Sequence, residues 1–132
     1  MMKKFIVIIL LYALISACDD TITIDDVDNK VIPDSNVSFG EHIYPVLQVK
    51  CAFTGCHAGA NPAGGLDLTT YGNVTADITV VFPGEPDLSS LVWTVEGTVG
   101  GLIMPPPGTG IVLTENQRKG FRIWVKEGAK NN

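Results

Sequence analysis

The sequence is poor in basic residues and has no apolar run long enough to span a membrane. Its 132 residues include nine lysine and arginine residues against fourteen aspartate and glutamate residues. Binding to nucleic acid phosphates requires positive charge, so this balance argues against a nucleic acid partner. The N-terminal apolar stretch, residues 5–15, is shorter than the roughly 20 residues of a transmembrane helix. The length suits one domain once a targeting segment is removed.

The sequence also lacks the residue sets that mark common enzyme classes. It shows no Ser/His/Asp set and no phosphate-cradling loop, and its carboxylates are scattered. No internal repeat is visible, and only two histidines are present. We therefore predict that the protein is not an enzyme.

Residues 1–17 have the layout of a secretory signal peptide. Two lysines precede the apolar run, and two small residues follow it before Cys18. The sequence ISAC at 15–18 resembles the lipobox of bacterial lipoproteins, although Ile15 stands where leucine is commoner. That resemblance implies lipidation of Cys18 and anchoring to a bacterial membrane, at its periplasmic face or at the outer membrane or cell surface. The alternative is that Cys18 is only a small residue near a signal cut.

Residues 18–36 are predicted to form an acidic, flexible tether. They contain six aspartates, opposed only by Lys30. Loss of the signal peptide removes two lysines, which leaves seven basic residues against fourteen acidic ones and a net charge of −7. The alternative is a first β-strand at TITI, residues 21–24.

Residues 37–130 are predicted to form one mostly α-helical domain of three to four short helices with long glycine- and proline-rich loops. Ser38 and Glu41 form a capping box for the first helix, in which Pro45 predicts a kink or a restart. Thr114 and Gln117 form a second capping box before the clearest helix, which Gly128 is placed to end.

Weaker signals predict the remaining elements. Asp87 is the expected N-cap of a helix over Leu88–Val95, and residues 66–74 suit one helical turn. Gly40 and Gly120 are candidate positions for a close crossing of the first and last helices. The apolar inventory is thin for a domain of this size, which favours a core completed by a cofactor or a covalent link.

The sequence CAFTGCH, residues 51–57, carries the strongest chemical signal. Exported thiols meet oxidising conditions, and lipidation of Cys18 would leave Cys51 and Cys56 as an isolated pair. Covalent haem attachment needs two thiols for the vinyl groups and an imidazole for the iron, usually as C-x-x-C-H. Here four residues separate the cysteines, so the loop must bulge, and Gly55 assists that bulge.

Two other chemistries remain open for this stretch. Cys51 and Cys56 are able to form a plain disulfide, or to join His57 and His42 in a zinc site. A structural zinc site needs four ligands, and these four residues are all that the sequence offers.

Three segments together resemble the small monohaem cytochrome c domains of bacterial exported proteins, including the planctomycete-type and class I-like modules. They are FGEHIYPVLQVKCAFTGCHAGANPAGGLDL, PGEPDLSSL and MPPPGTGIVLTENQRKGFRIWVKEGA, within residues 39–129. The C-x4-C-H spacing is a variant in such proteins. The resemblance implies one covalent haem c on Cys51 and Cys56, with His57 as the proximal iron ligand.

Met104 is the expected sixth ligand, because it precedes three prolines that hold its loop extended and matches the ligand loop of the resembled family. The alternatives are His42 as the ligand, or Met104 as an ordinary core residue. Ligation by methionine and histidine raises the reduction potential relative to two histidines. A backbone carbonyl, at Pro83 or nearby, is expected to hold the other ring nitrogen of His57.

Six apolar residues are candidates for the pocket wall, although generic core is an equally good assignment for each. They are Leu66, Leu68, Tyr71, Phe82, Leu91 and Trp93.

The leading interpretation is a membrane-anchored electron carrier that exchanges single electrons with redox partner proteins. One alternative is a haem-free lipoprotein with a Cys51–Cys56 disulfide that acts as a binding module. Another is a haem-based gas or redox sensor. A haem peroxidase built from such modules usually has a second haem loop, whereas this chain has one.

Overall fold

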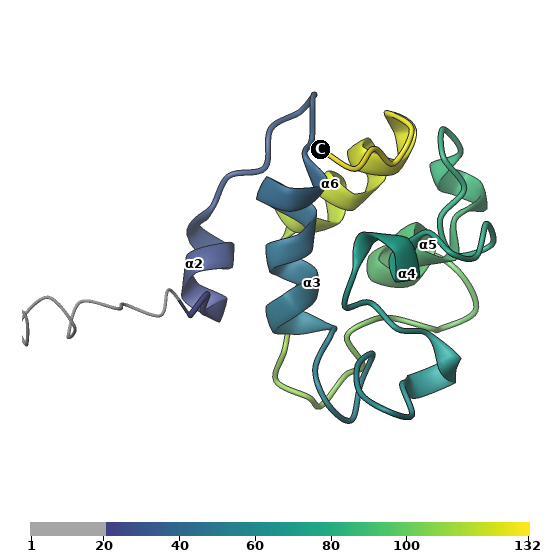
Figure 1. Ribbon diagram of the computed structural model, residues 1–132. Helices are drawn as coiled ribbons and strands as arrows, with labels where there is room; N and C mark the ends of the chain where they lie inside the picture. Colours follow the sequence, from purple (N-terminus) through teal and green to yellow (C-terminus); the bar gives the residue numbers. More distant parts are fainter. Residues whose placement is uncertain (1–20) are drawn as a thin grey trace, which may run out of the picture.

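The computed structural model describes residues 21–132, which form a helical body with long connecting loops (Figure 1). Within these residues there are five α-helices and no β-strand, which confirms the prediction of a mostly α fold. The helices are α2 (Ile24–Asn29), α3 (Tyr44–Lys50), α4 (Tyr71–Val74), α5 (Ser90–Glu96) and α6 (Glu115–Lys126). None of them has the length and apolar character needed to cross a membrane. The predicted signal peptide, residues 1–17, and the lipidation site Cys18 lie outside the described residues.

The predicted restart at Pro45 is observed as a π-helix, η1 (Phe39–Ile43), that runs directly into α3. Proline has no N–H to donate to the preceding turn. The π-helix, whose hydrogen bonds join residues five apart, ends where this donor is missing, with the Tyr44 N–H bonded to the Phe39 carbonyl. The capping box forms only in part. Ser38 Oγ accepts from the Glu41 N–H at 3.1 Å, but the Ser38 N–H donates to Nδ1 of His42 at 3.0 Å rather than to Glu41.

This contact makes the stability of the domain depend on the protonation of His42. Burial, and then the positive charge of Lys30, lower the pKa of His42 against an opposing effect of Glu41. A histidine with a lowered folded-state pKa stabilises the fold fully above its ordinary pKa of about 6.5, and this contribution is lost as the pH falls through the folded-state value. Protonation also removes the acceptor used by Ser38.

We therefore expect His42 to contribute up to about 1 kcal/mol less to the free energy of unfolding at about pH 5 than at about pH 7.5. Urea unfolding at the two pH values measures this loss. His42→Asn keeps an acceptor that does not titrate, so its loss of stability on acidification must be smaller than that of the wild type. An equal loss in both proteins contradicts the assignment.

Helix α6 agrees with its sequence signals. Thr114 and Gln117 form the complete capping box, and Phe121, Trp124 and Val125 are buried. Beyond its end, Gly128 has φ +98°, which glycine adopts without strain. This conformation lets the next N–H, that of Ala129, bond back to the Trp124 carbonyl at 2.9 Å.

An aromatic cluster joins η1, α4 and α6 in the core. The Phe39 ring lies 5.1 Å from the Tyr71 ring and 5.4 Å from the Trp124 ring, measured between centroids. The polar ends of the other two side chains are satisfied by the C-terminal segment, because Tyr71 donates to the Ala129 carbonyl and Trp124 Nε1 donates to the Lys130 carbonyl, both at 2.9 Å. The aromatic cluster therefore holds η1, α4, α6 and the C-terminal segment together.

Helix α5 begins later than predicted. A 3-10 helix, Pro86–Leu88, precedes it, and the side chain of Leu88 is 59% exposed rather than part of the apolar face. Asp87 does not cap α5, since its carboxylate accepts from Arg122 of α6 at 2.7 Å. The ion pair with α6 has replaced the predicted capping role.

Residues 24–37, here called the N-terminal arm, differ from the predicted flexible tether. Val27, Ile32 and Val37 are buried at five-residue intervals, and α2 lies beside α3 (Figure 1). The backbone of Ile32 exchanges two hydrogen bonds with the side chain of Asn116, at 2.8 and 2.9 Å. The segment TITI is not a strand either, because Thr23 caps α2. The folded body therefore begins at the arm rather than at residue 37.

Gly120 has a packing role, but its partner is the arm and not Gly40. A Cβ at Gly120 would lie 2.8 Å from Cδ1 and Cγ2 of Ile32, closer than real contacts allow. Because Gly120 has no side chain, Ile32 packs directly against α6 in the core.

Candidate cofactor site

The loop that carries the two cysteines leaves the end of α3 and folds back on itself. The Cys56 N–H donates to the Phe53 carbonyl, and the His57 N–H donates to the Cys51 carbonyl, both at 3.0 Å. Gly55 has φ +92°, a left-handed conformation that suits the bulge expected from the longer cysteine spacing. The backbone hydrogen bond between Cys51 and His57 holds the first thiol and the imidazole on one turn.

One nitrogen of the His57 ring is held by a backbone carbonyl. Nδ1 lies 3.0 Å from the carbonyl oxygen of Leu66, whereas the sequence suggested Pro83 or a neighbour. Because a carbonyl oxygen only accepts, this bond places the ring proton on Nδ1 and leaves the lone pair of Nε2 free. The Leu68 N–H also donates to the His57 carbonyl at 2.9 Å, which fixes the histidine at both its ring and its backbone.

The two thiols differ in their environments. Burial raises the pKa of Cys51 to about 12, and the neighbouring Cys56 adds to this shift while Lys50 opposes it. Cys51 is therefore a protonated thiol at neutral pH in this environment, whereas Cys56 is half-buried.

Both cysteines are free thiols, so the disulfide alternative has no support in the structure. Residues 21–132 also contain no group of three or more His, Cys, Asp and Glu side chains arranged to hold a metal ion. The zinc alternative is therefore not supported either.

The structure brings Cys51, His57 and Met104 to the walls of two adjoining cavities, of about 150 and 120 Å³. Cys56 lines the larger one. Met104 is half-buried, and its N–H donates to the carbonyl of Thr94 in α5 at 2.9 Å. This bond fixes the start of the methionine loop, which we define as residues 104–113.

Three of the six predicted wall residues line the smaller cavity, namely Leu66, Leu68 and Leu91. The other three do not line either cavity. Tyr71 belongs to the aromatic cluster, Phe82 is exposed and Trp93 is half-buried. The sequence reasoning missed several wall residues: Phe53, Ala63, Val80, Ser90, Thr94, Val95, Thr109 and Ile111. Thr94 and Val95 follow Leu91 at helical spacing, which was the one usable signal for them.

His42 lies elsewhere in the fold. It lines a small cavity with Val27, Ile32 and Pro45, against the N-terminal arm. Its Nδ1 is already the acceptor for Ser38. Of the two donors considered for the sixth position, only Met104 lies beside His57.

The chemistry of these side chains fits a haem. Two thiols stand on one loop, the imidazole of His57 is held through its Nδ1, and a soft thioether shares their cavity. The walls are predominantly apolar, as expected of a cofactor pocket. Among the described residues that line them, Lys50 is the only one with a charged side chain, and its charge is paired.

The helical fold and the donor set of this site are those expected of a haem-binding cytochrome domain. Residues 54–108 match the family model of planctomycete cytochrome C, and this match supports a cytochrome c-type domain. The match covers less than half of the chain. It includes Cys56, His57 and Met104, and it begins three residues after Cys51. Comparison with curated proteins and with solved structures gave no match.

Proposed function

We propose that this protein is a membrane-anchored monohaem c-type cytochrome that carries single electrons between redox partner proteins. In this proposal Cys51 and Cys56 bind the haem covalently, and His57 and Met104 ligate its iron. The observation that carries the proposal is the meeting of Cys51, His57 and Met104 at one pair of cavities, with Nε2 of His57 left free.

Each cysteine would add its S–H bond across one vinyl double bond. The sulfur bonds to one carbon and the hydrogen passes to the other, so no external oxidant or reductant is needed. The hydrogen bond from His57 Nδ1 to the Leu66 carbonyl orients the ring and increases the basicity of Nε2. Bound haem supplies a one-electron iron couple, and the methionine and histidine donors favour a comparatively high reduction potential.

The membrane anchor in this proposal is the lipidated Cys18. It rests on the lipobox resemblance, with a signal peptide at residues 1–17, and it places the domain outside the cytoplasm, where c-type domains typically reside. Its test is Cys18→Ala, which is expected to release the protein from the membrane fraction without removing the haem.

The test of covalent haem attachment is a denaturing gel stained for haem peroxidase activity. We expect the wild type, made in a host able to assemble c-type cytochromes, to stain at its own mass. The double variant Cys51→Ala/Cys56→Ala is expected to lose the stain completely, because both thioether bonds are absent. Cys18→Ala is the matched control and must retain the stain. A wild-type protein that does not stain would falsify the proposed function.

A further inference from the structure

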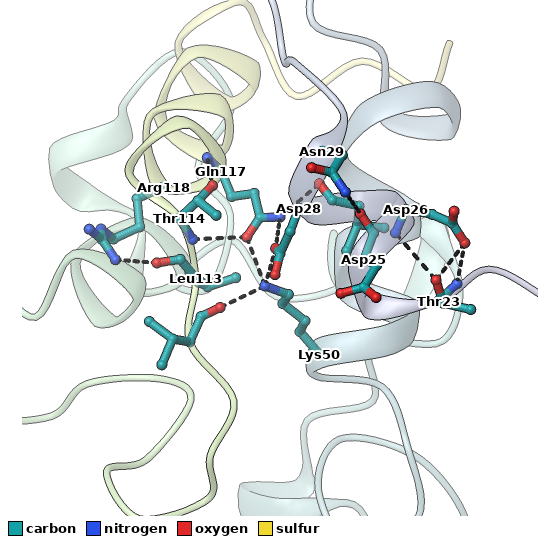
Figure 2. Close-up of polar contacts among 12 residues, drawn as sticks. Thr23, Asp25, Asp26, Asp28, Asn29, Lys50, Leu113, Thr114, Gln117 and Arg118 are labelled. Carbon is teal, nitrogen blue, oxygen red and sulfur yellow. Dashed lines mark hydrogen bonds and ion pairs between the residues drawn. The ribbon is translucent and has the colours of Figure 1, made fainter.

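The side chain of Lys50 is the most deeply buried charged group in residues 21–132. Lys50 is 2% exposed, directly precedes Cys51 and lines the larger of the two cavities. The ammonium group has three donors, and all three are used (Figure 2). They bond to the Asp28 carboxylate, to the Val112 carbonyl at 2.6 Å and to Oε1 of Gln117 at 3.2 Å.

These three partners come from three different segments. Asp28 belongs to the N-terminal arm, Gln117 belongs to α6, and Val112 lies near the end of the methionine loop. Gln117 also donates from Nε2 to the Val27 carbonyl at 3.0 Å and to Asp28 at 2.8 Å. The arm and α6 therefore hold each other as well as Lys50, and this fixes the position of the ammonium group.

The methionine loop has few other attachments. Its first residue, Met104, bonds to Thr94, and its last residue, Leu113, accepts from Arg118. In the stretch between them, the other hydrogen bonds run within the loop, such as those that Thr109 makes with Pro106 and Ile111. Within residues 21–132, Lys50 thus supplies the one hydrogen bond that reaches the loop from outside between its two fixed ends.

We propose that Lys50 is a positioning residue that, held by Asp28 and Gln117, fixes the methionine loop through the Val112 carbonyl and so keeps Met104 on the iron. The inference rests on the proposed function, because it presupposes a haem with Met104 as its ligand. The physical basis is that a buried ammonium group must keep all its partners, since loss of any one leaves an unsatisfied charge or polar group. The hydrogen bonds of Lys50 therefore favour one arrangement of its partners. Because the Val112 carbonyl is one of these partners, they also favour one conformation of the methionine loop.

Imidazole is a suitable probe because it competes with Met104 for the ferric iron. Its apparent affinity depends on the fraction of molecules in which Met104 is detached, so a looser loop binds it more tightly. In the purified haem-loaded protein, we expect Lys50→Met to tighten imidazole binding about tenfold, as the loss of one or two hydrogen bonds predicts. Asp28→Asn, which retains the shape of the side chain and should fold even if Lys50→Met does not, is expected to act in the same direction.

The controls are Lys119→Met and Asp34→Asn. Lys119 of α6 and Asp34 of the arm form an exposed ion pair, with 2.7 Å between Nζ and Oδ1, that also joins the arm to α6 but does not touch the loop. These variants are expected to bind imidazole within about twofold of the wild type, as exposed pairs contribute little. A cluster that acted only through its charge would leave imidazole affinity unchanged. It would move the reduction potential in opposite directions in Lys50→Met and Asp28→Asn, and that result overturns the positioning role.

Met104→Ala separates failure of this inference from failure of the proposed ligation. If the wild type binds imidazole as tightly as Met104→Ala does, Met104 is not the ligand and both proposals are overturned. If the wild type binds it weakly and Lys50→Met and Asp28→Asn bind it equally weakly, only the positioning role is overturned.

Discussion

Replacing Met104 with alanine is expected to lower the reduction potential of the haem-loaded protein by on the order of 100 mV, a fraction of the range of about 0.8 V that axial ligands span. The neutral, soft thioether favours ferrous over ferric iron, and alanine removes it. The ferrous variant should also bind carbon monoxide readily, whereas the wild type, with its sixth position filled, should resist it. Potentiometric titration and carbon monoxide difference spectra measure the two effects.

Leu102→Ala is the matched control for this experiment. Leu102 is exposed and lies two residues before Met104, so its loss leaves the ligand in place. Equal potentials and spectra for Met104→Ala and the wild type would show that Met104 does not ligate the iron. Ready binding of carbon monoxide by the wild type would instead favour a gas sensor over an electron carrier.

Replacing Trp124 with alanine is expected to reduce the free energy of unfolding by about 3–5 kcal/mol, the usual cost of deleting a buried aromatic side chain. Trp124 is fully buried, contacts the Phe39 ring and donates to the Lys130 carbonyl. Denaturant unfolding followed by circular dichroism measures the change. The variant also loses the contact between η1 and α6, so its unfolding should begin at a lower denaturant concentration.

Two further variants divide this effect into its parts. Trp124→Phe keeps the aromatic contact but loses the indole donor, so a loss of about 1–3 kcal/mol is expected from the orphaned carbonyl and the smaller ring. Lys126→Ala, at an exposed position of the same helix, should change stability by no more than about 0.5 kcal/mol. A loss below about 1 kcal/mol in Trp124→Ala would contradict the packing described for the core.

The elements that the sequence predicted well are those whose signals are local. The capping box at Thr114 and the glycine at 128 specify the two ends of α6 through contacts within a few residues. The restart of the helix near Pro45 was predicted in the same way, because the missing donor of proline acts within one turn. The bulge of the cysteine loop also belongs to this group, because Gly55 produces it locally.

The arm was missed because composition and packing point in opposite directions there. Four aspartates in the arm suggest a solvated chain, yet three buried apolar residues and the cap at Thr23 are enough to fold it. The partner that accepts Ile32 is Gly120, 88 residues later, and no local pattern reveals such a pairing. A run of acidic residues therefore did not exclude order in this segment.

The site was predictable only as far as its donor atoms. The resemblance to monohaem cytochromes implied that the side chains of the cysteine loop and of Met104 would meet, and they line the same cavity. The Leu66 carbonyl that holds His57 carried no signal, because every residue has a carbonyl. The role of Lys50 also had no sequence signal, because it depends on residues 28, 112 and 117, which only the tertiary structure brings together.

The packing of the arm against α3 and α6 also limits how far the domain could travel from a bilayer. A lipid on Cys18 would leave only residues 19–23 as a linker between the membrane and the start of α2. Even fully extended, that stretch reaches about 18 Å. In that case the domain would stay close to the lipid headgroups, and a protein that exchanges electrons with it would have to approach the membrane surface.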